Sequence, residues 1–169
     1  MEEFPTSDFP PLERDVGRSL HFFNSRIACS KHNFSINEAA MLVELVQIIE
    51  DEPEHASLLA YAFRKAHYKT SIAYDGWAGL EAVRRLKPAL VVLDVMLPDL
   101  DGYGVCRLLR KDPETQRIPI LLISALDDKI HRSLAQILGA DDLVTKPFSL
   151  QEIVQRATHL IRGGCAKER

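Results

Sequence analysis

The sequence has few cysteines and no long apolar run. Its three cysteines, Cys29, Cys106 and Cys165, are odd in number and widely spaced, which argues against a disulfide framework or a zinc site and favours a reducing compartment. No apolar run approaches the roughly 18 residues of a membrane span. The acidic start, MEEFPTSDFPPLERD, lacks the apolar core of a secretory signal. These absences predict a cytoplasmic protein without membrane insertion.

The sequence also lacks a basic surplus, an internal repeat and any low-complexity tract. Its formal net charge of −3 argues against a domain built to bind nucleic acid, because such domains usually carry excess positive charge. What it does have is 169 residues with 46% hydrophobic content. That is enough for the core of one ordinary domain, with room for an extension.

Residues 1–40 differ in character from the rest of the chain. They include three prolines within the first 11 positions and show no sustained periodicity, so they predict a mostly disordered N-terminal extension. A short helix near 36–43 is the one element suggested there, with Ser35 as N-cap and Glu38 closing a capping box. Two origins stay open for this segment: a true upstream extension, or sequence ahead of a translation start at Met41.

From residue 43 onward, short apolar runs alternate with amphipathic segments. Short, continuously apolar strands between helices predict a parallel sheet covered on both faces, and right-handed crossovers then favour a doubly wound α/β sandwich. This domain is expected over residues 43–162, with a flexible tail at 163–169. The predicted strands are 44–50, 69–74, 89–94, 118–124 and 142–146, and the predicted helices are 55–67, 77–86, 104–111, 129–140 and 149–163.

Polar side chains follow four of the five predicted strands, at the point where each strand ends. Glu50 and Asp51 end the first, Asp94 the third, Ser124 the fourth and Lys146 the fifth. Ligands of open parallel sheets bind beyond the carboxyl ends of the strands, so the carboxylates converge if the first and third strands are neighbours. Like charges raise one another's pKa, and Mg²⁺ resolves such a conflict while leaving room for a phosphate. The set suits phosphorylation of an aspartate.

These motifs resemble the CheY-like receiver domains of two-component response regulators. The matching pieces lie within residues 43–162 and are, in order, IIEDEP, LVVLDVMLPDLDGYG, LLISA and GADDLVTKPF. The resemblance implies a flavodoxin-like fold, with a five-stranded parallel sheet in the order 2-1-3-4-5 and helices on both faces. It also implies a cytoplasmic signalling switch rather than a turnover enzyme.

The resemblance assigns a role to each acid of the predicted site. It implies that Asp94 accepts a phosphoryl group from a histidine kinase or a histidine phosphotransfer protein. Glu50 and Asp51 would hold Mg²⁺ together with Asp94 and the backbone carbonyl of Met96. The cofactor expected on this basis is therefore Mg²⁺.

The resemblance also assigns the remaining site residues and the partners. Ser124 and Lys146 would bind the phosphoryl oxygens, and the Lys146–Pro147 peptide bond is expected to be cis. The face made by the fourth helix, fifth strand and fifth helix is the expected contact surface for an unknown downstream protein or a homodimer partner. The chain ends soon after the last helix, which fits either a single-domain regulator or part of a larger protein.

Two other functional classes compete with the phosphorylated switch. A Mg²⁺-dependent aspartyl phosphohydrolase would want a general acid two residues after Asp94, where this chain has Met96, and the chain has no cap domain. A receiver fold that only binds partners and is never phosphorylated is the second alternative. The complete set of acids, hydroxyl and lysine argues against it.

Several other conspicuous residues have a structural explanation. Asp99 and Asp101 are expected to be turn residues, and the Asp141–Asp142 pair is expected to be structural. A phosphotransfer role is conceivable for His55 or His67, but exposed helix histidines are far commoner. Trp77 and Cys106 are predicted to be packing residues.

The sequence departs from the family at a position whose side chain usually moves on phosphorylation and so changes the protein surface. An aromatic residue is usual three positions before the lysine, and this chain has Leu143 there. We therefore expect a muted switch, carried by movement of the loop after Ser124 and of the helix that follows. Met96 and Leu126 flank the path of an attacking water and cannot orient it, which predicts slow self-dephosphorylation.

Overall fold

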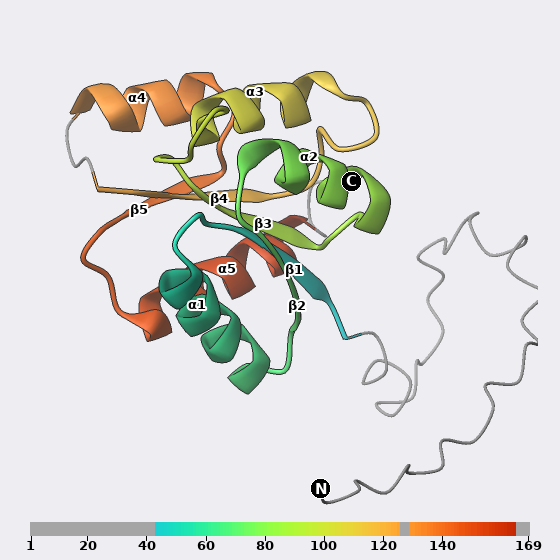
Figure 1. Cartoon of the computed structure of the whole chain (residues 1–169), viewed down its shortest axis with the longest axis vertical. Helices are drawn as coiled ribbons and strands as arrows, with labels where there is room; N and C mark the ends of the chain where they lie inside the picture. The colour runs from blue at the N-terminus through green and yellow to red at the C-terminus, as the bar shows by residue number, and fades with distance from the viewer. Residues whose placement is uncertain (1–42, 126–128, 165–169) are drawn as a thin grey trace, which may run out of the picture. The chain divides into compact units, whose positions relative to one another are not determined.

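The computed structural model describes residues 43–125 and 129–164, and in them five strands alternate with five helices (Figure 1). The predicted extension at 1–40, the short helix near 36–43 and the tail beyond residue 164 lie outside this range. No helix in the described part is long and apolar enough to cross a membrane. The elements are β1 (Leu45–Ile49), α1 (Pro53–Lys65), β2 (Lys69–Ala73), α2 (Gly76–Leu86), β3 (Leu90–Asp94), α3 (Gly102–Lys111), β4 (Ile120–Ser124), α4 (Lys129–Ile137), β5 (Asp142–Thr145) and α5 (Leu150–Gly164).

The five strands form one parallel sheet in the order β2-β1-β3-β4-β5, which confirms the predicted topology. Strand β3 lies at the centre, and every residue of β3 and β4 is buried. This burial explains why both strands are continuously apolar up to their last residue, since a strand covered on both faces has no polar side.

Helices cover both faces of the sheet, as a doubly wound fold requires. Figure 1 places α2, α3 and α4 over one face and α1 and α5 over the other. Each layer has its own core of buried apolar side chains. The first core joins Leu80, Val83, Val105, Leu109 and Ala135 to the sheet, and the second joins Leu59, Phe63, Ile153, Ala157 and Ile161 to it.

Three helices begin earlier than the sequence pattern predicted. Pro53 opens α1, where the fixed φ of proline suits the first turn. Asp75 and Asp101 are the N-caps of α2 and α3, and accept hydrogen bonds from Ala78 N and Gly104 N, each at 2.7 Å. The predicted starts were late because each helix begins with proline or glycine, which adds nothing to the apolar periodicity.

The ends of the last two helices also differ from the prediction. Helix α4 ends at Ile137 rather than at residue 140, because Gly139 adopts a left-handed φ of 87° and turns the chain toward β5. Helix α5 continues to Gly164, one residue beyond its predicted end. At its start, Ser149 Oγ accepts a hydrogen bond from Glu152 N at 3.1 Å, which is one half of a capping box.

The two predicted packing residues have opposite outcomes. Cys106 is fully buried, and its desolvation raises the pKa of the thiol to about 11 although Arg110 opposes the shift. Trp77, by contrast, is 60% exposed, so its assignment to the core was wrong. The buried side of α2 is made by smaller residues, among them Gly79 and Ala82, and Trp77 is not one of the buried residues of this helix.

Candidate functional site

The strand order brings the predicted site residues to one edge of the sheet. Strands β1 and β3 are hydrogen-bonded neighbours, with Ile49 paired to Leu93, so Glu50 and Asp94 occupy adjacent strand ends. The next pairings bring in the other two strands, with Asp94 paired to Ile123 and Ser124 paired to Thr145. The four strand ends that carry polar groups therefore lie at one edge of the sheet.

Asp94 is held in a fixed orientation at the end of β3. Its carboxylate is 3% exposed. One oxygen, Oδ1, accepts a hydrogen bond from Met96 N at 2.8 Å, and the other, Oδ2, contacts the Nζ of Lys146. A buried carboxylate with one oxygen on a backbone amide and the other on an ammonium has little freedom to rotate.

Glu50 lies beside this pair and is as deeply buried. Its Oε2 is 3.5 Å from Lys146 Nζ, and its Oε1 is buried without a hydrogen-bond partner among the described residues. Burial, and then the charge of Asp94, raise the pKa of Glu50 to about 7, although Lys146 opposes the shift. One ammonium therefore serves two buried carboxylates, and the site has a surplus of negative charge.

Lys146 carries the compensating charge. Burial disfavours its ammonium form, but the hydrogen bond to Asp94 and the charges of Asp94 and Glu50 outweigh this, so the pKa of Lys146 is raised. Its backbone N donates to Ser124 O at 2.8 Å, which ties the end of β5 to the end of β4. The Lys146–Pro147 peptide bond is cis, as predicted.

Asp51 and Ser124 complete the comparison with the prediction. Ser124 is fully buried at the end of β4. Asp51 is exposed, and it does not join the close group formed by Glu50, Asp94 and Lys146. Within residues 43–125 and 129–164, no group of three or more His, Cys, Asp or Glu side chains is placed to hold a metal ion. Of the three carboxylates expected to converge, the structure brings two together.

The loop between β3 and α3 has the turn chemistry predicted for it. Asp99 is exposed and adopts a left-handed φ of 62°, and Asp101 caps α3. Gly102 N donates to Val95 O at 3.0 Å. A Cβ at Gly102 would lie 2.8 Å from the Cα of Val95 and 2.9 Å from the carbonyl carbon of Asp94, so only glycine fits there.

His55 lies beside the site, a position that the sequence analysis did not predict for it. His55 Nδ1 lies 3.2 Å from Glu52 Oε2 and 3.9 Å from Glu50 Oε1, and the side chain is 48% exposed. The spacing of Glu52 and His55 could have indicated their contact, since residues three apart on a helix share a face. The exposed position agrees with the structural explanation given above for the helix histidines.

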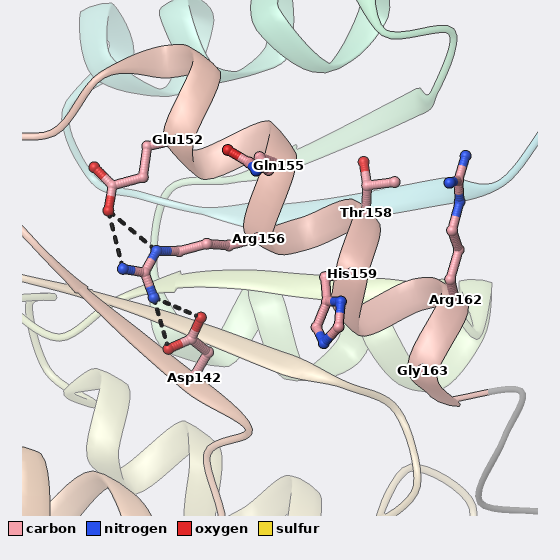
Figure 2. Close-up of a pocket in the computed structure, with 8 residues that line it drawn as sticks. All are labelled: Asp142, Glu152, Gln155, Arg156, Thr158, His159, Arg162 and Gly163. Atoms are coloured by element: carbon pink, nitrogen blue, oxygen red, sulfur yellow. Dashed lines mark hydrogen bonds and ion pairs between the residues drawn. The ribbon is translucent and has the colours of Figure 1, made fainter.

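A separate hollow runs along α5 and the start of β5 (Figure 2). Arg156 lines this hollow and forms ion pairs with both Asp142 and Glu152, at 3.0 Å in each case. Its charge is thereby already balanced, and none of the predicted site residues reaches this hollow. The lining residues are Asp142, Glu152, Gln155, Arg156, Thr158, His159, Arg162 and Gly163.

Comparison with known proteins agrees with this geometry. The family model for the response regulator receiver domain matches residues 46–158, which is more than half of the chain. The chain therefore belongs to the response regulator receiver domain family. Members of this family are signalling domains of two-component systems that work with histidine kinases and phosphotransfer proteins.

Three solved structures illustrate the similarity. The signal receiver domain of a signal transduction histidine kinase from Syntrophus aciditrophicus is 32% identical, covering 71% of this chain and 91% of that one, with a TM-score of 0.63. The BeF3-activated N-terminal receiver domain of RstA from Klebsiella pneumoniae is 31% identical (70% and 98% covered, TM-score 0.65). The receiver domain of the sensor histidine kinase PA1611 from Pseudomonas aeruginosa PAO1, with magnesium coordinated in its active site cleft, is 24% identical (70% and 97% covered, TM-score 0.65) and supports the fold.

Proposed function

We propose that this domain is a phosphorylation-dependent switch in which Asp94 accepts a phosphoryl group from a histidine kinase or a histidine phosphotransfer protein. The observation that carries the proposal is the contact between the Lys146 ammonium and the buried Asp94 carboxylate, next to the buried Glu50. Perturbed, buried ionisable groups at the carboxyl edge of a parallel sheet are typical of a functional site. Residues 43–162 are the switch unit in this proposal.

The chain's own residues account for most of the chemistry. A carboxylate oxygen of Asp94 attacks the phosphorus, and the bond from phosphorus to the donor's histidine nitrogen breaks, with the electron pair and a proton ending on that imidazole. Met96 N fixes the orientation of the attacking carboxylate. Lys146 and the Ser124 hydroxyl then hold phosphoryl oxygens, where charge is concentrated during transfer.

The donor set also fits Mg²⁺. Glu50, Asp51, Asp94 and the carbonyl of Met96 offer the hard oxygen ligands that this ion prefers, and Glu50 Oε1 is a buried carboxylate oxygen without a hydrogen-bond partner in the part of the chain described. When bound, the ion would neutralise the carboxylates and shield the incoming phosphoryl oxygens. The exposed side chain of Asp51 would have to turn toward Asp94 to take part.

Incubation of the full chain with a small phosphodonor and Mg²⁺, read by intact mass, tests the proposal. We expect a gain of one phosphoryl group that requires Mg²⁺ and is lost in Asp94→Asn. The matched control is Asp99→Asn, an exposed acid in the same loop, which should be phosphorylated like the wild type. Phosphorylation of the Asp94→Asn variant would refute the assignment, and an unmodified wild type would favour a binding module that is never phosphorylated.

We further propose that the face made by α4, β5 and α5 binds the downstream protein or a second copy of the chain. Ile130 and Ile137 on α4 are 75% and 80% exposed. Large apolar side chains exposed on one helix are typical of a contact surface. Arg156 and Asp142, ion-paired on the same face, would form part of the polar rim.

A further inference from the structure

Helices α3 and α4 are joined by a contact between two ring side chains. The hydroxyl of Tyr103, on α3, and Nδ1 of His131, on α4, share a hydrogen bond of 2.9 Å. The two rings are nearly parallel, at 17°, with centroids 6.1 Å apart. Both side chains are partly buried, so this contact is held by packing as well as by the hydrogen bond.

Tyr103 is linked to the backbone of Asp94 through its neighbour Gly102. It follows Gly102, whose N–H donates to Val95 O and whose Cα approaches Asp94 so closely that a Cβ would not fit. No side chain intervenes between the end of β3 and the first turn of α3. A shift of the backbone at Asp94 is therefore passed to Tyr103, because close-packed groups cannot absorb it.

His131 lies in the first turn of α4, a helix that is loosely packed and anchored at its far end. Ala135 is the one buried residue of α4. Beyond the helix, Arg110 of α3 donates to Gly139 O at 2.7 Å and to Ile118 O at 2.8 Å, and pairs with Asp141 at 2.6 Å. The segment after α4 is therefore held by α3, and Asp141 also accepts a hydrogen bond from Ile120 N at the start of β4. In the first turn of α4, His131 contacts Tyr103 of α3.

Leu143 on β5 is already packed inside. It is 9% exposed and belongs to the same core cluster as Ala135 of α4 and Leu122 of β4. Because Leu143 is already buried, it cannot move from an exposed to a buried position when Ser124 moves. The residue that stands in the place of the usual aromatic therefore has no large movement with which to report phosphorylation.

We propose that the Tyr103–His131 contact transmits the state of Asp94 to α4, in place of a side chain on β5. In this arrangement α4 pivots about the end held by Arg110, and its first turn follows Tyr103. The inference rests on the proposed phosphorylation of Asp94. It adds a route from that site to the face of α4 that a partner would contact.

Hydrogen exchange of the full chain, with and without a small phosphodonor and Mg²⁺, tests this route. We expect phosphorylation to change amide exchange in residues 129–137 of the wild type and to leave 138–142 unchanged. In Tyr103→Phe, which keeps the ring, we expect the change in 129–137 to fall about threefold or more, the factor that one lost hydrogen bond supplies. His131→Gln should have the same effect if Tyr103→Phe proves too unstable to study.

The matched control is Tyr68→Phe, which also removes a half-buried hydroxyl. Tyr68 donates to Thr158 Oγ1 at 3.1 Å, in the other helix layer, so its loss should leave the response of α4 intact. Intact mass measured in the same samples distinguishes failure of the proposed function from failure of the proposed route to α4. A wild type that gains no phosphoryl group refutes the proposed function. A phosphorylated Tyr103→Phe or His131→Gln variant whose α4 responds like the wild type refutes the route.

Discussion

Among single residues, Glu50 is the least exposed acid in the part of the chain that the structure describes. It is 2% exposed, shares one ammonium with Asp94, and its pKa is raised to about 7. Burial without full compensation costs free energy whenever the carboxylate is charged. Functional sites commonly store such a cost, because the group that relieves it is a ligand.

The first prediction follows from this pKa. Since the folded value of about 7 lies above the unfolded value of 4.5, the folded state holds more protons between them. The free energy of unfolding should therefore fall as pH rises from about 4.5 to 7, by up to about 3 kcal/mol for a shift of this size. Denaturant unfolding from pH 5 to 8 without divalent ions measures it. Glu50→Gln should remove this slope, and parallel profiles for the two proteins would contradict the prediction.

The second prediction concerns Met96, two residues after Asp94. Its side chain is 62% exposed and apolar, and the other residue expected to flank the attacking water, Leu126, lies outside the described range. Because neither can orient water, the phosphoryl group on Asp94 should be lost slowly. Phosphoprotein followed by intact mass in Mg²⁺ buffer gives the half-life. Met96→Gln should shorten it by supplying a polar group, and a wild-type half-life of seconds would show that the explanation is wrong.

Among the elements, α3 makes close contacts with the backbone of neighbouring segments at both of its ends. Its first residue, Gly102, packs on the backbone of β3, and Arg110, near its end, holds the turn between α4 and β5. Both attachments are made to backbone atoms of other elements. A helix fixed in this way at both ends can connect the phosphoacceptor strand to α4 as one rigid unit.

Gly102→Ala should test the attachment at the start of α3. A methyl group there would meet the Cα of Val95 at 2.8 Å, and the backbone would have to move, at a cost of about 1–3 kcal/mol. Gly163→Ala, where a Cβ meets nothing within 4 Å, is the control and should stabilise α5 by about 0.5–1 kcal/mol. Denaturant unfolding compares the two. Equal effects would contradict the close contact.

Arg110→Lys should test the attachment at the other end. Lysine keeps the charge but cannot reach Gly139 O, Ile118 O and Asp141 at once, because it lacks the guanidinium fork. We expect a loss of about 2 kcal/mol or more and faster amide exchange in residues 138–141. Arg107→Lys, on the exposed side of the same helix, should change neither. If both variants behaved alike, Arg110 would not be an anchor.

For the whole molecule, the sheet order decides which groups meet. The order β2-β1-β3-β4-β5 places the ends of β1 and β3 side by side and those of β4 and β5 next to them. Charges that lie far apart in the sequence are concentrated at one edge. Binding of a cation there should stabilise the entire fold, because the unfolded chain has no such site.

Mg²⁺ should therefore raise the free energy of unfolding. An ion concentration ten times the dissociation constant stabilises by about 1.4 kcal/mol. Asp51→Asn should remove the effect while leaving the metal-free stability unchanged, since Asp51 is exposed. Thermal unfolding with Mg²⁺ or with EDTA measures both quantities. An undiminished Mg²⁺ effect in Asp51→Asn would exclude this residue as a ligand.

The sequence by itself determined the alternation of strands and helices, the parallel doubly wound fold and the strand ends that carry polar groups. It could do so because apolar periodicity, caps and strand-terminal acids are local features of the chain. The prediction for Trp77 failed because it used a local feature alone. Trp77 was assigned to the core from its residue type, whereas its exposure depends on which side of α2 meets the sheet.

Only the tertiary structure decided how those groups interact. The raised pKa of Glu50, the exposed position of Asp51 and the contact between Tyr103 and His131 depend on distances across the sheet and between helices. The same is true of the buried position of Leu143. Coulomb interactions weaken with distance, and both they and the desolvation penalty grow with burial. A sequence pattern that places residues on the same edge sets neither the distances nor the burial.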